Sequence, residues 1–238
     1  MIVATRAIVI SALKYGDSSL IVKCLTASAG MRSYLLKGVR NSRKGKLKAA
    51  YFQPLTQLEI VANHKDKGTL ETIREAKISY PYQSLHTDIR KNAMAFFLAE
   101  VLSVSIYEEE DTKMMFHFVE AALQWLDLHD EVSNFHIAFL IMLTRYLGFY
   151  PDDTYQDLPF FDLEQGAFTN IPTSTVISDE NLVAFKSFLG IIFDDIPLIK
   201  LTRTGRADLL KILITYFELH LQGFKKPKSI VVLNEVFN

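Results

Sequence analysis

The first third of the chain alternates short apolar runs, rich in β-branched residues, with polar turns. Alternation of this kind over four to eight residues, bounded by Gly, Asn and Asp, is typical of β-strands. The pattern predicts five strands, at residues 5–13, 20–26, 31–39, 55–62 and 69–77. Five short strands favour a small barrel, and the five-stranded OB-fold has this strand count and size.

After Pro81 the apolar residues recur every three to four positions, which is typical of helices that face a core. The first such stretch runs from Ile89 to Val104, and Thr87 or Asp88 is available as its N-cap. Further helices are predicted at 114–128, 135–147, 181–193 and 206–221, and Gly148 is placed to end the third.

Between 151 and 172 no helical period persists, so this segment is predicted to be a structured loop or hairpin insert. The expected fold class is therefore α+β. An N-terminal five-stranded OB-fold barrel, residues 1–80, precedes a mostly α-helical domain, residues 81–238.

Composition adds a core and an uneven charge distribution. With 238 residues, of which 49% are hydrophobic, the chain can bury a sizeable core, which excludes disorder as its main state. The net charge of −1 conceals opposite regions. Residues 1–80 hold 14 Lys and Arg against 5 Asp and Glu, residues 81–199 hold 5 against 19, and residues 200–228 hold 7 against 2. Basic regions of this kind favour a nucleic-acid partner.

The strongest functional signal is the stretch from Arg32 to Lys48, which holds seven basic residues and no acid. Long cationic side chains on an Asn/Ser/Gly-rich loop can converge on phosphates, and aromatic rings beside them can stack on bases. A solvated basic loop beside core aromatics is the alternative. The candidate DNA-binding residues are Arg32, Tyr34, Lys37, Arg40, Arg43, Lys44, Lys46 and Lys48.

A second basic set surrounds the last long predicted helix. It consists of Lys200, Arg203, Arg206 and Lys211, followed by Lys225, Lys226 and Lys228. This set either forms an ordinary solvated helix face or extends the path of a bound strand.

Other chemistry is sparse. Cys24 is the only cysteine, which excludes an intramolecular disulfide and favours a reducing compartment, and its apolar strand predicts a buried, inert thiol. The N-terminus does not read as a signal peptide, and no apolar run is long enough to span a membrane. No hydrolase or zinc-protease motif is present, so we expect no enzyme activity, cofactor or small-molecule substrate.

The order and spacing of several short motifs resemble the RecO family of bacterial DNA repair and recombination mediators. They include the run from Arg6 to Ile10, the run from Lys14 to Val22, Lys37-Gly-Val-Arg40, Phe52-Gln-Pro-Leu55 and Tyr146-Leu-Gly-Phe-Tyr-Pro151. The resemblance covers nearly the whole chain. It implies an OB-fold that binds DNA through Lys37, Arg40, Arg43, Lys44, Lys46 and Lys48, with Arg32 as a weaker candidate.

The resemblance also implies a set of partners and a mechanism. Such a protein binds single- and double-stranded DNA, anneals complementary strands, and engages strands coated by single-strand-binding protein. With RecR it helps to load the recombinase, without being an enzyme. The implied location is cytoplasmic and nucleoid-associated.

The sequence departs from the family pattern at one place. Many RecO proteins carry a four-cysteine zinc module where this chain has residues 154–171 and no cysteine. Because thiolates hold such a zinc ion, we expect no metal here, and an apolar cluster of Phe160, Phe161, Leu163 and Phe168 in its place.

Two other classes of function stay open. An RNA-binding or ribosome-associated OB-fold protein would have the same charge distribution. A metal-dependent nuclease is the enzyme alternative, and it would use Asp152, Asp153, Asp157 and Asp162.

Overall fold

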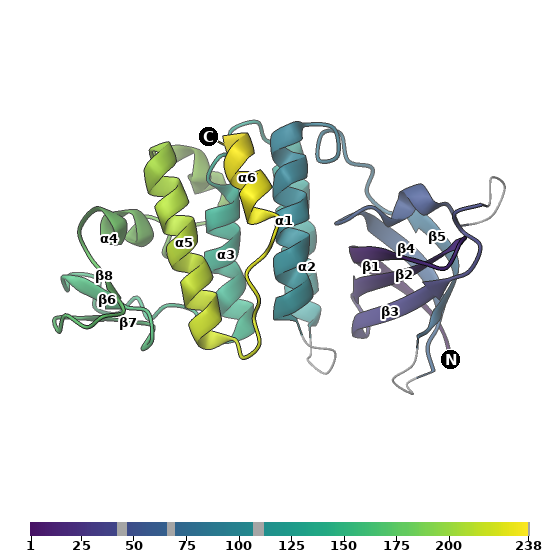
Figure 1. The fold of residues 1–238 in the computed structure, drawn as a ribbon, viewed down its shortest axis with the longest axis horizontal. Coiled ribbons are helices and arrows are strands. Elements are labelled where there is room, and N and C mark those ends of the chain that lie inside the picture. The colour runs from purple at the N-terminus through teal and green to yellow at the C-terminus, as the bar shows by residue number, and fades with distance from the viewer. Residues whose placement is uncertain (42–46, 66–69, 107–111, 238) are drawn as a thin grey trace. The chain divides into compact units, whose positions relative to one another are not determined.

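The computed structural model describes four stretches of the chain: 1–41, 47–65, 70–106 and 112–237. They form two compact units, Met1–Asp127 and Leu128–Asn238 (Figure 1). The first unit contains a β-sheet and then two helices, and the second is mainly helical. The division into domains 1–80 and 81–238 stays a prediction.

All five predicted strands are present and form one antiparallel sheet in the order β3-β2-β1-β4-β5. Their bounds are β1 (Ile2–Tyr15), β2 (Ser19–Thr26), β3 (Gly30–Leu36), β4 (Gln57–Asn63) and β5 (Thr72–Ile78). A short 3₁₀ helix, η1 (Ala49–Phe52), lies between β3 and β4.

The sheet curls because β1 is long and irregular. Its first half pairs with β4 and its second half with β2, and the register shifts between Val9 and Ser11. Such a bulge bends a strand and increases its twist. The curl brings β3 to Glu71, whose backbone accepts from Leu35 N at 2.8 Å and donates to Ser33 O at 3.0 Å. No longer ladder joins β3 and β5 in the described residues, so the sheet is OB-like without being a closed barrel.

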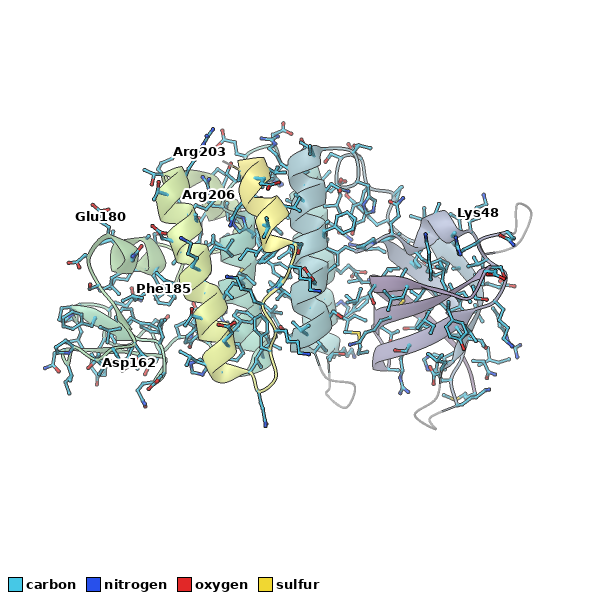
Figure 2. The ribbon with its side chains drawn as sticks, viewed as in Figure 1. Lys48, Asp162, Glu180, Phe185, Arg203 and Arg206 are labelled. Atoms are coloured by element: carbon cyan, nitrogen blue, oxygen red, sulfur yellow. The ribbon has the colours of Figure 1, made fainter. Side chains whose placement is uncertain are left out.

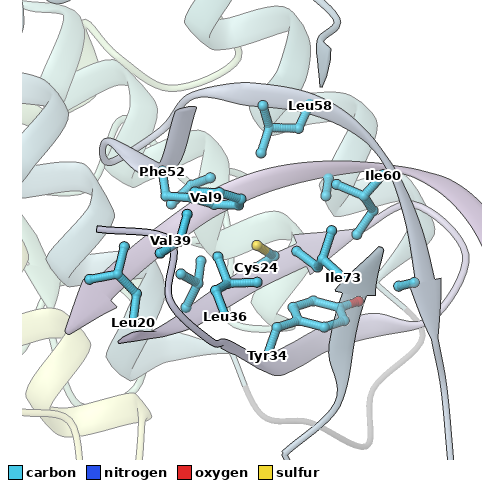
Figure 3. Close-up of a cluster of buried hydrophobic side chains, with 13 residues drawn as sticks. Val9, Leu20, Cys24, Tyr34, Leu36, Val39, Phe52, Leu58, Ile60 and Ile73 are labelled. Carbon is cyan, nitrogen blue, oxygen red and sulfur yellow. The ribbon is translucent and has the colours of Figure 1, made fainter. Parts of the chain in front are cut away.

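The core of the sheet lies on its concave side and is built from alternating residues of all five strands (Figure 3). Cys24 is fully buried in it, and burial raises the pKa of its thiol to about 12. The thiol is therefore protonated at neutral pH, which confirms the predicted inert cysteine.

Two long helices complete the first unit, α1 (Ile89–Ser105) and α2 (Lys113–Leu128). Asp88 caps α1, because its carboxylate accepts from the backbone amides of Arg90 and Lys91. This confirms one of the two predicted caps. The helix buries ten of its seventeen residues. The predicted apolar period is only partly right, because Ala93, Phe97 and Val101 are buried whereas Ile89 and Phe96 are 73% and 50% exposed.

The segment that precedes α1 is fixed to the end of α2 by a buried polar network. The Asp127 carboxylate accepts from the backbone amides of Gln83, Ser84 and Leu85 at 2.9, 2.8 and 2.8 Å. The buried Lys91 ammonium donates to Ser84 Oγ at 2.7 Å and to Asp127 O at 2.8 Å. Every group in this network has a partner, which is the condition for burying a lysine and an aspartate.

In the second unit, the described elements are α3 (Phe135–Leu147), β6 (Phe160–Asp162), β7 (Ala167–Thr169), β8 (Val176–Ile177), α4 (Asp179–Lys186), η2 (Phe193–Leu198), α5 (Arg203–His220) and α6 (Ile230–Phe237). Gly148 ends α3 at φ 84°, as predicted. The predicted helix at 181–193 was too long. The α-helix α4 ends at Lys186, and the separate 3₁₀ helix η2, which contains Pro197, begins at Phe193. The sequence pattern did not reveal α6, whose eight residues are too few to establish a helical period.

The predicted insert is a small three-stranded sheet in the order β7-β6-β8. Phe161 at its centre is fully buried, and its ring lies 5.0 Å from that of Phe168 and 4.6 Å from that of Phe185 on α4, measured between centroids. Leu163 is also buried. The expected apolar cluster is therefore present, with Phe160 only half-buried at its margin.

Candidate nucleic-acid interface

The exposed part of the basic stretch begins directly after β3, which ends at Leu36. Lys37 and Arg40 are exposed, and Val39 between them is buried at 3% exposure. Gly38 makes the turn at φ 68°, a conformation that other residues rarely adopt. Alternation between core and solvent thus fixes the backbone while both cationic side chains point outward.

Two hydrogen bonds attach this turn to the hairpin between β1 and β2. Arg40 N donates to Ser18 O at 3.0 Å, and Arg40 Nη1 donates to Asp17 O at 2.9 Å. The sequence stretch itself gave no sign of this contact, because it joins residues more than twenty positions apart. Because both acceptors are backbone carbonyls, neither hydrogen bond gives the Arg40 guanidinium a carboxylate partner.

The stretch returns to the sheet at Lys48, which is exposed at the start of η1 (Figure 2). Its ammonium lies 5.7 Å from the centre of the Tyr51 ring. Phe52, at 2% exposure, anchors the helix in the core of the sheet. The buried Val39 therefore anchors the backbone beside Lys37 and Arg40, and the buried Phe52 anchors η1 beside Lys48. Arg43, Lys44 and Lys46 lie outside the described residues.

Arg32 has a different environment from these exposed cations. It lies on β3, where its Nε donates to Ala29 O at 3.1 Å and its Nη1 lies 3.6 Å from Glu71 Oε1. The nearby carboxylate offsets part of its charge. Arg32 is thus the weakest cation of the described set for attracting phosphate.

Tyr34 was predicted to stack on bases, and the structure corrects this. Its ring is fully buried in the core of the sheet, and its hydroxyl lies 2.9 Å from His64 Nε2. Burial strongly raises the pKa of the phenol. The period of β3 explains the error, because Tyr34 shares its face of the strand with the buried Leu36. We therefore leave Tyr34 out of the interface.

The second basic set surrounds α5: Lys200 precedes it, Arg203, Arg206 and Lys211 lie on it, and Lys225, Lys226 and Lys228 follow it. Arg203 and Arg206 are labelled in Figure 2. Arg206 is half-buried, and its Nε donates to Asn134 Oδ1 at 3.0 Å. Burial, and secondarily the neighbouring Arg203, lower its pKa. Lys211 is paired with Asp208 at 3.1 Å, and Lys200 donates to Pro197 O at 2.9 Å. Arg203 and Lys200 are exposed and have no carboxylate partner among the ion pairs of the described residues, and Lys225, Lys226 and Lys228, which follow α5, are exposed as well.

Two of the four aspartates of the nuclease alternative, Asp152 and Asp162, have structural partners instead. Asp162 is buried and accepts from two backbone amides and from the hydroxyls of Thr173 and Thr175. Asp152 accepts from the amide and hydroxyl of Thr154 at 3.0 and 2.5 Å. Within the described stretches, no three His, Cys, Asp or Glu side chains are grouped so that they could hold a metal ion.

The described helices include none that is both long and apolar enough to cross a membrane.

The chain is similar to known proteins over its whole length. Residues 1–82 match the family described as "Recombination protein O N terminal", and residues 86–229 match "Recombination protein O C terminal".

Individual relatives agree with these family matches. The chain is 52% identical to the "DNA repair protein RecO" of Christiangramia forsetii and 48% identical to that of Flavobacterium johnsoniae, in each case over 238 residues and the full length of both chains. It is 35% identical to the protein of the same name from Bacteroides fragilis, again over all of both chains. The chain therefore belongs to the RecO family of DNA repair proteins.

Proposed function

We propose that this protein is a non-enzymatic mediator of DNA repair and recombination that binds single- and double-stranded DNA and anneals complementary strands. With RecR, it helps to load the recombinase on strands coated by single-strand-binding protein. A cytoplasmic, nucleoid-associated location is part of the proposal.

One observation carries the proposal: exposed cations stand on a rigidly anchored rim of the OB-like sheet. Lys37, Arg40 and Lys48 are exposed, while the neighbouring Val39 and Phe52 are buried. Annealing requires that phosphate repulsion is neutralised while the bases stay accessible. Lysine and arginine side chains that contact only the backbone meet that requirement without reading sequence.

The middle of the chain, residues 81–199, has little positive charge to attract DNA. Residues 81–199 carry 19 acids and 5 bases, so this part is expected to repel phosphate. We propose that it faces solvent or protein partners. The single-strand-binding protein and RecR are the partners that family membership favours.

A fluorescence assay tests the proposal directly. Two complementary oligonucleotides, one with a donor dye and one with an acceptor, are mixed with and without saturating single-strand-binding protein. We expect the protein to accelerate annealing in both cases and the Arg40→Ala/Lys48→Ala variant to lose most of the acceleration. No acceleration by the unmodified protein would reject the proposal.

A competition experiment distinguishes the proposed DNA-binding role from the RNA-binding alternative. Unlabelled RNA and DNA strands of the same sequence and length compete for the protein against a labelled DNA strand. Our proposal predicts that DNA competes at least as well as RNA. A clear preference for RNA would favour a ribosome-associated or other RNA-binding role.

A further inference from the structure

A second feature of the first unit lies beside η1 and is unrelated to the basic side chains. It is a cavity of about 320 Å³ lined by Gln53, Pro54, His86, Asn92, Ala95 and Phe96. The first two residues follow η1, His86 belongs to the segment before α1, and the last three come from α1. The cavity is therefore formed by three parts of the chain within one compact unit.

The cavity exposes an aromatic ring that the fold does not use. Phe96 is 50% exposed, although its neighbours Ala95 and Phe97 on α1 are buried at 1% and 0%. Leaving about half of a phenylalanine in water forgoes part of its hydrophobic burial energy. An exposed ring in a cavity is available to stack on a planar ligand.

Polar groups at the cavity suit the edge of a nucleobase. Gln53 and Asn92 carry amides, which both donate and accept hydrogen bonds, as base edges require. Asn92 Nδ2 also donates to His86 O, in a long hydrogen bond of 3.5 Å. The His86 ring contacts the Tyr82 ring edge-on, with 5.3 Å between centroids, and its Nε2 lies 3.4 Å from Thr56 Oγ1. Burial lowers the pKa of His86, so its imidazole is neutral at physiological pH. Neither a strong anion nor a strong cation lines the cavity.

The cavity lies close along the chain to the end of the basic stretch. Lys48 precedes η1 and Gln53 follows it. A 3₁₀ helix rises about 2 Å per residue, so the two residues are roughly 10 Å apart along the chain. That is a span of about three stacked nucleotides at about 3.4 Å each. A strand whose phosphates contact Lys48 can thus bring a base to the cavity.

We propose that this cavity binds one nucleobase of single-stranded DNA, with Phe96 as its stacking platform and the Gln53 and Asn92 amides at its edge. The inference rests on the proposed function, because the strand is positioned by the basic stretch. It adds base binding to a surface that otherwise contacts phosphates, and it gives the bound strand a direction from Lys48 toward α1.

The test compares two DNA strands of equal length and equal phosphate number, one with all its bases and one fully abasic. Fluorescence anisotropy gives the affinity of each. We expect Phe96→Ala to weaken binding of the base-bearing strand by about 5-fold or more. Binding of the abasic strand should change by less than about twofold, because the phosphate contacts are retained. Phe96→Trp should keep the affinity, since it keeps a ring.

Two variants separate failure of this inference from failure of the proposed function. Lys48→Ala should weaken both strands alike, and Met114→Ala, at a residue 70% exposed on α2, should weaken neither. If Phe96→Ala weakens both strands equally, or neither, the base site is rejected while the phosphate surface stands. If the unmodified protein binds neither strand, the proposed function itself is rejected.

Discussion

The hydroxyl of Tyr34 lies 2.9 Å from Nε2 of His64, in the core of the OB-like sheet. His64 is only 3% exposed, and its Nε2 is also 3.6 Å from Glu71 Oε2. The three side chains connect β3 to the ends of β4 and β5 at the point where the sheet curls. An aromatic residue beside a basic stretch can thus serve the core alone.

Tyr34→Phe should therefore affect stability and not DNA binding. Removing the hydroxyl leaves the buried imidazole nitrogen of His64 without this partner, at a cost of about 1–2 kcal/mol in the free energy of unfolding. Urea denaturation measures this loss, and anisotropy with single-stranded DNA should give an affinity within about twofold of the unmodified protein. A large loss of affinity for single-stranded DNA with unchanged stability would show instead that Tyr34 takes part in DNA binding.

Gly166 in the turn between β6 and β7 should not tolerate a side chain. It has φ 65°, and a Cβ there would lie 2.8 Å from the Tyr216 hydroxyl, which donates to Phe149 O. Gly190→Ala is the matched control, because it has φ 71° and open space around it. Both variants carry the cost of a positive φ, about 1 kcal/mol, and Gly166→Ala should lose at least about 1 kcal/mol more. Equal losses in thermal denaturation would mean that the contact with Tyr216 is unimportant.

Asp127 should make the first unit sensitive to acid. Burial alone would raise the pKa of its carboxyl, but hydrogen bonds from the amides of Gln83, Ser84 and Leu85 outweigh burial and hold the pKa below 3.8. A lowered folded-state pKa stabilises the protein above the ordinary value, and this contribution is lost as the pH falls through the folded-state pKa.

Asp127→Asn should accordingly lose about 2 kcal/mol of unfolding free energy at pH 7. The difference in unfolding free energy between the variant and the unmodified protein should become smaller as the pH falls below 3.8. Glu59→Gln, at an exposed carboxylate that pairs with Lys77, is the control and should change stability little at either pH. A difference in unfolding free energy that does not change with pH would show that the network acts through packing alone.

The insert should be stable without metal. Its centre is Phe161, packed against Phe168 and Phe185, in a chain with a single cysteine. Phe161→Ala should destabilise the second unit by about 3–5 kcal/mol, whereas a chelator should leave its melting temperature unchanged. Elemental analysis should find no stoichiometric zinc. One zinc per chain would contradict this account of the insert.

The elements with a strong local pattern could be predicted from the sequence, and those fixed by distant contacts could not. The role of Cys24 was assigned correctly, and Asp88 was one of the two predicted caps, because strand alternation and capping are local signals. Tyr34 was misassigned because composition cannot say which side of β3 faces the core when both sides carry apolar residues. Arg40 reaches the β1–β2 hairpin, and no pattern within its own segment indicates such a contact.

The cavity beside η1 shows the same limit. Gln53 and Phe96 are far apart in the sequence, and each resembles an ordinary loop or helix residue there. Only the fold brings an amide, an imidazole and an exposed ring to one place. The uneven distribution of charge along the chain, in contrast, can be read from the sequence without knowing the fold, so the basic stretch could be identified from composition.

The central claim is that the basic stretch neutralises DNA phosphates, and the salt dependence of single-strand affinity tests it most directly. If about five to seven phosphates are neutralised, log affinity should fall against log salt with a slope of about −4 to −5. Replacing Arg40, Arg43, Lys44 and Lys46 by Ala should flatten the slope by about 3, at about 0.7 per contact. A charge-matched variant in the acidic region, with Arg90, Lys113, Arg145 and Lys186 replaced by Ala, should keep the original slope. An unchanged slope in the first variant would contradict the claim.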